Sequence, residues 1–90
     1  MKMQFTFHAD PGHAWLSVPR KMLFDLGIAE KITPYSYEKD NTVYLEEDCD
    51  ASTFFHAAKA KGIELEFAER HINCQSAIRR YERFCLKPNE

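Results

Sequence analysis

The chain has 90 residues, which suits one domain with a single hydrophobic core. Its apolar fraction of 44% is sufficient for that core, and its net charge of −2 by itself points to neither a nucleic-acid nor a membrane partner. No apolar run is long enough to cross a membrane, and residues 1–8 alternate in polarity instead of forming a signal sequence. The three cysteines match no disulfide framework, so the reducing cytoplasm of a cell is the expected compartment.

The chain is expected to begin with a β-hairpin. Residues 3–7 alternate apolar and polar side chains, which is the period of a strand with one buried face. Asp, Pro and Gly at 10–12 are turn formers. Residues 14–18 alternate again and place Trp15 on the face opposite Leu16. If helices cover only the Leu16 face, Trp15 is exposed, at least in part, and becomes a candidate binding anchor.

A short helix and a third strand are predicted next. Pro19 suits the first position of a helix, an apolar stripe covers residues 22–26, and Gly27 ends it. A connector follows over residues 29–34. Alternating tyrosines at 35 and 37 indicate a strand.

The clearest pattern covers residues 42–67 and predicts strand, helix and strand. Residues 42–46 are rich in β-branched and aromatic side chains. Phe54 and Phe55 belong to one apolar stripe of a helix over residues 51–61, preceded by Asp48 and Asp50, either of which can cap it. Gly62 suits the left-handed end of that helix, and residues 63–67 return to strand period.

A short C-terminal helix is expected within residues 76–85, after a break at 73–76. The order is therefore ββαββαβα in a single domain spanning residues 1–90. This pattern predicts an α+β fold with a mixed, mostly antiparallel sheet of about five strands and two to three short helices on one face. The connection from 46 to 63 is long enough for a right-handed parallel crossover.

Charge is unevenly distributed along the chain. Residues 1–69 hold seven Lys/Arg and twelve Asp/Glu, whereas residues 70–90 hold five and two. An acidic cluster of Glu46, Glu47, Asp48 and Asp50 is either a solvated helix cap or a docking surface for a basic partner. Arg70, Arg79, Arg80 and Arg83 form a basic patch, and the last three are expected on one side of the C-terminal helix. This patch is either a contact for phosphate or an acidic partner, or the solvent-exposed side of that helix. We therefore expect partner binding at Trp15, Glu46, Glu47, Asp48, Arg79, Arg80 and Arg83.

The sequence favours no catalytic or metal site. His8, Asp10 and His13 surround the first turn, but no fourth ligand is near in sequence. Cys49 precedes a helix, yet Asp48 and Asp50 oppose a thiolate there, so a buried or half-buried structural cysteine is the simpler interpretation. Serine-hydrolase and phosphate-loop motifs are absent. We therefore expect neither an enzyme nor a cofactor.

The chain resembles a family of short uncharacterised proteins of phages, prophages and plasmids. The similarity is carried by DPGHAWLSVP at 10–19, ITPYSY at 32–37, TVYLEEDCDAS at 42–52, KAKGIE at 59–64 and SAIRRY at 76–81. Proteins of this size in mobile elements are often accessory factors that disable host defence. The resemblance therefore implies a protein-binding role, such as anti-CRISPR or anti-restriction activity.

A local resemblance points to a different function. WLSVPRKMLFDLGI at 15–28 with NTVYLEED at 41–48 is similar to AbrB-type DNA-binding proteins, which form swapped-hairpin dimers. Only Arg20 and Lys21 match the family's basic positions, and the acidic balance of residues 1–69 departs from it.

The leading hypothesis is a non-enzymatic protein that binds and inhibits or modulates a host protein or nucleoprotein complex. The alternative is a small DNA-binding regulator with an AbrB-like segment. Nucleic-acid contact through the C-terminal arginines and a homodimer are left open, and no membrane partner is expected.

Overall fold

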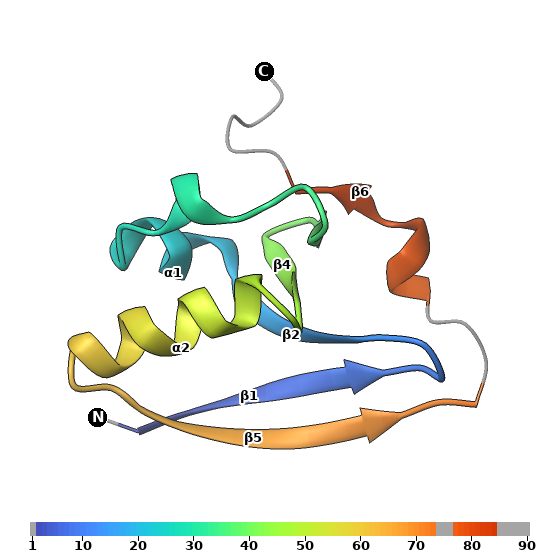
Figure 1. The fold of residues 1–90 in the computed structure, drawn as a ribbon, viewed down its shortest axis with the longest axis horizontal. Helices are drawn as coiled ribbons and strands as arrows, with labels where there is room; N and C mark the ends of the chain where they lie inside the picture. The colour runs from blue at the N-terminus through green and yellow to red at the C-terminus, as the bar shows by residue number, and fades with distance from the viewer. Residues whose placement is uncertain (1, 74–76, 85–90) are drawn as a thin grey trace.

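The computed structural model describes residues 2–73 and 77–84, which form six strands, two α-helices and two 3₁₀ helices (Figure 1). In chain order the elements are β1 (Lys2–Ala9), β2 (Ala14–Pro19), α1 (Arg20–Asp25), η1 (Ala29–Lys31), β3 (Tyr37–Lys39), β4 (Thr42–Glu46), α2 (Asp50–Ala60), β5 (Glu64–His71), η2 (Ala77–Arg80) and β6 (Glu82–Arg83). The predicted α+β class is confirmed. Within the described residues, no helix is long and apolar enough to cross a membrane.

The strands form one mixed sheet in the order β5-β1-β2-β4-β3-β6. β1 and β5 are parallel, and every other neighbouring pair is antiparallel. The predicted crossover is present, because α2 connects β4 to β5 and these two strands run in the same direction. Figure 1 shows the result: β5 and β1 run side by side, α2 lies beside them and runs roughly along their length, and β4 is steeply inclined to β1.

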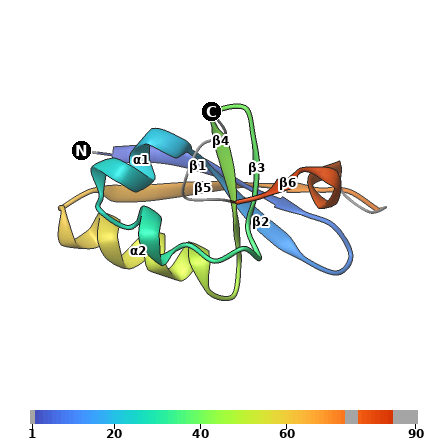
Figure 2. The ribbon, with the colours of Figure 1, turned by 90° about the horizontal axis from the view of Figure 1, so that it is seen from above.

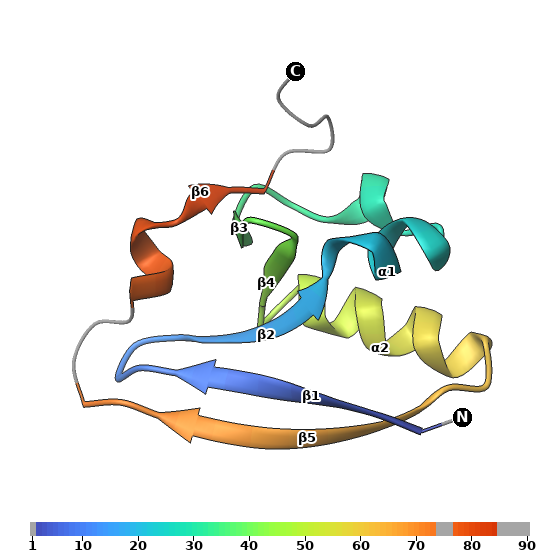
Figure 3. The ribbon, with the colours of Figure 1, turned by 180° about the vertical axis from the view of Figure 1, so that it is seen from behind.

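The core lies between the sheet and the two α-helices. Phe5, Leu16, Val18, Val43 and Leu45 are buried on one face of the sheet, as the alternation predicts. Leu23 of α1 and Phe54 of α2 belong to the same cluster, and Figure 3 shows both helices from behind. The hairpin, the α2 stripe and the glycine at its end were therefore all predicted. Gly62 has the expected positive φ of 74°.

A buried carboxylate anchors the N-terminus of α2. Asp50 is 1% exposed and accepts hydrogen bonds from the Thr33 amide, the Thr33 hydroxyl at 2.7 Å and the Ser36 hydroxyl. Ser36 Oγ in turn accepts the Glu46 amide at 2.9 Å. Negative charge is favourable at a helix N-terminus, so one side chain ties the connector, β4 and α2 together.

Two expectations about the chain after β5 are wrong. Residues 77–80 form a 3₁₀ turn and β6 follows at once, so there is no α-helix in the described part of the C-terminal region. The sheet is also not left open on the face away from the helices. Ile78 is 4% exposed there, and Tyr81 stacks on Tyr44 with ring centroids 5.1 Å apart. Figure 2 shows this C-terminal segment (residues 77–84) at the far end of the molecule from α2.

Phe54 should be the larger contributor to stability of the two adjacent phenylalanines. It is fully buried and meets the Phe5 ring edge-on at 5.2 Å, whereas Phe55 is half-buried. We expect Phe54→Ala to lower the free energy of unfolding by about 3–5 kcal/mol, because it leaves a cavity in the core. Phe55→Ala should cost clearly less. Denaturant titration checks both, and equal losses would contradict this account of the core.

Candidate functional site

A pocket of about 400 Å³ brings together five of the seven residues that the sequence predicts as a site. We call it the aromatic pocket, and the five residues are Trp15, Glu46, Asp48, Arg79 and Arg83. Trp15 pairs with Glu46 and Tyr37 pairs with Arg83, so these side chains share the sheet face away from the helices. Four other residues, which the sequence did not single out as a set, complete the lining: His13, Tyr35, Tyr37 and Cys49.

Trp15 is the floor of this pocket and not an exposed anchor. It is only 3% exposed, so the expectation of exposure is wrong. The Arg79 guanidinium lies over its ring at 5.5 Å from the centroid, and His13 and Tyr37 have ring centroids at 5.9 and 6.1 Å. The reason is the C-terminal segment, which covers this face of β2.

Arg79 is held by a bidentate ion pair with Asp10. Nε donates to Oδ2 at 2.7 Å and Nη2 to Oδ1 at 2.9 Å. The Asp10 side chain is completely buried, and its Oδ1 also accepts the amides of Gly12 and His13 in the hairpin turn. The hydrogen bonds that Arg79 donates to Asp10 raise the pKa of Arg79 above its usual value. Gly12 permits this approach, because a Cβ there would lie 2.9 Å from Nη2 of Arg79.

The three predicted arginines do not form one patch. Arg83 packs over the Tyr37 ring at 5.3 Å and donates to the Pro34 carbonyl at 3.0 Å, so it lines the aromatic pocket with Arg79. Arg80 lies elsewhere, in a second hollow. The prediction that all three share one side of a helix fails because residues 77–83 form a 3₁₀ turn followed by a strand.

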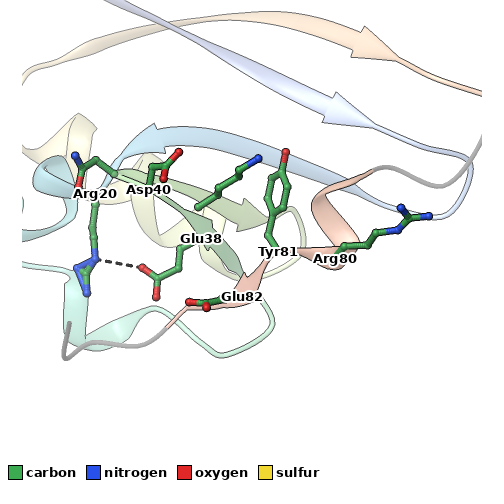
Figure 4. Close-up of a pocket in the computed structure, with 8 residues that line it drawn as sticks. Arg20, Glu38, Asp40, Arg80, Tyr81 and Glu82 are labelled. Atoms are coloured by element: carbon green, nitrogen blue, oxygen red, sulfur yellow. Dashed lines mark hydrogen bonds and ion pairs between the residues drawn. The ribbon is translucent and has the colours of Figure 1, made fainter. Parts of the chain in front are cut away.

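That second hollow, the charged groove, has a volume of about 700 Å³ (Figure 4). Arg20 pairs with Glu38 there at 3.3 Å, and Lys39 lies over the Tyr81 ring at 5.0 Å. Arg20 also lies over the rings of Phe24 and Phe84 at 5.1 and 5.4 Å. Figure 4 shows Arg80 pointing away from the Arg20–Glu38 pair. The charged residues of this groove, above all the Arg20–Glu38 pair, therefore hold α1 to the β3–β6 edge of the sheet. We assign the charged groove a structural role.

The predicted acidic cluster also divides into parts with different environments. Asp50 is buried in its own network, and Glu46 accepts the amides of Asp48 and Cys49 at 2.8 and 3.0 Å. Asp48 and Glu47 are exposed, with Asp48 at the aromatic pocket and Glu47 at a hollow beside Phe7. Asp48 is therefore the exposed acidic residue of the aromatic pocket, whereas the predicted Glu47 lies outside it.

Cys49 is exposed at the rim of the pocket and is a free thiol, so the expectation that it is buried or half-buried is wrong. Cys74 and Cys85 lie outside the described residues.

The histidines of the first turn do not converge on one point. His8 Nε2 is 3.1 Å from Ser17 Oγ, His13 lies beside Trp15, and Asp10 is engaged by Arg79. Over residues 2–73 and 77–84, no group of three His, Cys, Asp or Glu side chains is placed to hold a metal ion.

Comparison of the chain with protein-family models, with curated proteins and with solved structures finds no match. The function must therefore be argued from the site itself.

Asp10 should matter more for folding than its place in a turn suggests. Asp10→Ala removes the ion pair and the two turn hydrogen bonds, so we expect a loss of about 2–3 kcal/mol in unfolding free energy. Asp10→Asn keeps one carbonyl oxygen for the turn and should lose less. Denaturant titration gives the energies, and Trp15 fluorescence reports the packing of Arg79. Arg80→Glu, in the charged groove, is the control and should leave both readouts nearly unchanged.

Stability should fall on mild acidification because of His8. Burial, assisted by the nearby Arg70 charge, lowers the pKa of His8 from its usual 6.5. The unfolded chain therefore binds a proton more readily than the folded one, so stability is lost as pH falls through 6.5 toward the folded pKa. NMR titration of the His8 ring should give a midpoint below 6.5, and His8→Gln should flatten this part of the stability profile. A midpoint above 6.5 would contradict the assignment.

Proposed function

We propose that this chain is a non-enzymatic binding protein that docks on a host protein or nucleoprotein complex through the aromatic pocket and its acidic rim. The observation that carries the proposal is the convergence of Trp15, Glu46, Asp48, Arg79 and Arg83 on one pocket. These residues come from β2, the end of β4, the loop before α2, η2 and β6. A site assembled from so many segments and fixed by an ion pair and hydrogen bonds is preorganised, which lowers the cost of binding.

Three polar side chains of the pocket already bond to other groups of the protein, and this favours a binding role over a catalytic one. Arg79 is paired with Asp10, Arg83 with the Pro34 carbonyl, and Glu46 with two amides at the start of α2. These contacts fix the walls of the pocket. The exposed Asp48 and the 67% exposed Tyr35 are left at the rim, where a partner can reach them.

The chemistry of the rim favours a partner with a basic segment. Asp48 is exposed at the pocket, and residues 1–69 carry seven basic against twelve acidic residues. An aromatic ring such as Tyr35 beside a carboxylate suits a Lys or Arg side chain, which can stack on the ring and pair with the charge. Occlusion of such a segment on a defence complex is the mode of action that the mobile-element resemblance implies.

The DNA-binding alternative gains less from the geometry. A phosphate-binding surface needs several cations on one accessible face, yet Arg79 and Arg83 lie in the aromatic pocket and Arg80 lines another hollow. The AbrB-like segment is built into a single sheet in which β2 pairs with β4 of the same chain.

The proposal predicts that the rim decides partner capture. Asp48→Lys and Tyr35→Ala change exposed side chains, so both variants should fold as the parent does and lose capture of the host protein from nuclease-treated lysate. Arg80→Glu is the matched control, because it changes an exposed charge outside the pocket, and it should capture normally. Each variant is compared with the parent by thermal melting and by yield of the captured protein.

Other outcomes would assign other functions. If nuclease treatment abolishes capture and Arg80→Glu weakens it, the DNA-binding alternative holds. If Asp48→Lys is silent while Cys49→Ser or His13→Ala abolishes the biological effect, the pocket acts as an enzyme site.

A further inference from the structure

β5 is a long strand with an open edge at one side of the sheet. It has eight residues and pairs with β1 in an unbroken register from Lys2–Glu64 to Ala9–His71. No other described strand lies on its outer side. The opposite edge of the sheet is β6, which has only two residues. Long regular edges invite pairing with another strand, whereas short ones do not.

The direction of the backbone groups along β5 can be assigned. The Ile72 amide donates to the Ala9 carbonyl, directly after the last residue pair with β1. Because amide and carbonyl directions alternate along a regular strand, residues 64, 66, 68 and 70 point toward β1. The amides and carbonyls of Leu65, Phe67 and Glu69 therefore point outward, where a second strand could pair with them.

We propose that β5 pairs antiparallel with β5 of a second copy, with Phe67 opposite Phe67 on the two-fold axis. In this register the outward groups of Leu65 face those of Glu69, and Phe67 faces its own copy, as an antiparallel ladder requires. Registers shifted by one residue place outward groups opposite inward ones and cannot form the ladder.

The charges of β5 are self-complementary in this register. Glu64 of each copy lies opposite Arg70 of the other, so two oppositely charged pairs form, and Glu66 lies opposite Ala68. No like-charged pair is directly opposite between residues 63 and 71. A register shifted by two residues would set Phe67 against Glu69 and use Glu66, which already pairs with Lys2 at 3.5 Å. The register centred on Phe67 is therefore favoured.

The side chain of Phe67 adds an apolar contact at the same place. It is 42% exposed and lies against Phe55 and Phe7, with ring centroids 5.1 and 5.5 Å away. Directly opposite residues of an antiparallel pair point to the same face, so the two Phe67 rings would meet beside α2 of both copies. The exposed end of this aromatic cluster would thereby be covered.

This dimer goes beyond the proposed function and does not depend on it. β5 lies at the opposite side of the sheet from β3 and β6, which contribute to the aromatic pocket. Both aromatic pockets of the dimer would stay accessible, away from the β5–β5 interface. The dimer could then bind at two sites to a partner that contains two copies of the same segment.

Light scattering coupled to size exclusion tests the proposal on the full chain. At sub-millimolar concentration the parent should have twice the chain mass of 10.5 kDa. Arg70→Glu and Glu64→Arg each set like charges opposite each other at two symmetric positions, so each should weaken dimerisation about tenfold. The double variant Glu64→Arg/Arg70→Glu restores opposite charges and should restore the dimer.

The controls separate this register from other modes of association. Glu66→Arg changes a neighbouring exposed charge on the same face and should leave the dimer intact. If instead Glu66→Arg/Arg70→Glu is the pair that rescues, the register is centred on Ala68 and the proposal is wrong. A monomeric parent at sub-millimolar concentration, or a dimer that neither single reversal weakens, would also overturn it. Thermal melts establish that each variant is folded.

Discussion

The site depends on one ion pair, between Asp10 in the first turn and Arg79 near the end of the chain. These residues are 69 positions apart, and their carboxylate and guanidinium meet in a bidentate geometry at 2.7 and 2.9 Å. Asp10 alone would be a buried charge, which is costly unless paired. The pair therefore stabilises the hairpin turn and fixes the C-terminal segment over Trp15 at the same time. Without it, the aromatic pocket would lack one wall.

Most of the fold could be predicted because local periodicity and burial agree. Strand alternation in β1 and β2 and the Phe54 stripe of α2 each specify which side faces the core. The last element could not be predicted in this way. Residues 76–85 have a helical spacing of apolar side chains, but residues 77–83 form a 3₁₀ turn and a short strand, with Ile78 buried and Tyr81 half-buried against the sheet. Tertiary contacts with Tyr44 and Tyr37 decide that conformation, and they leave no periodic signal in the sequence.

The sequence predicted most residues of the site but not how they are arranged. Charge clustering and aromatic content single out Trp15, Asp48 and Arg83, and the pocket includes all three. The sequence predicted separate acidic and basic surfaces. The two kinds of group meet in one pocket because β2 pairs with β4 and β3 pairs with β6, and neither pairing could be read from the sequence. Tyr35 and Tyr37 were assigned to a strand, and only the register shows that Tyr37 faces Arg83.

The division of the charged residues between structure and surface narrows what the pocket can do. Each guanidinium in it packs on an aromatic ring, Arg79 on Trp15 and Arg83 on Tyr37, and each also donates to a protein oxygen. Such cations are poor candidates for transient contacts with a polyanion, because binding one would compete with contacts that hold the fold together. The exposed carboxylate of Asp48 carries no such cost, because it can pair with a cation of another molecule without loss of structure. Arg79 and Arg83 lie close by, but both are engaged within the protein. This surface is therefore suited to attract a positively charged partner.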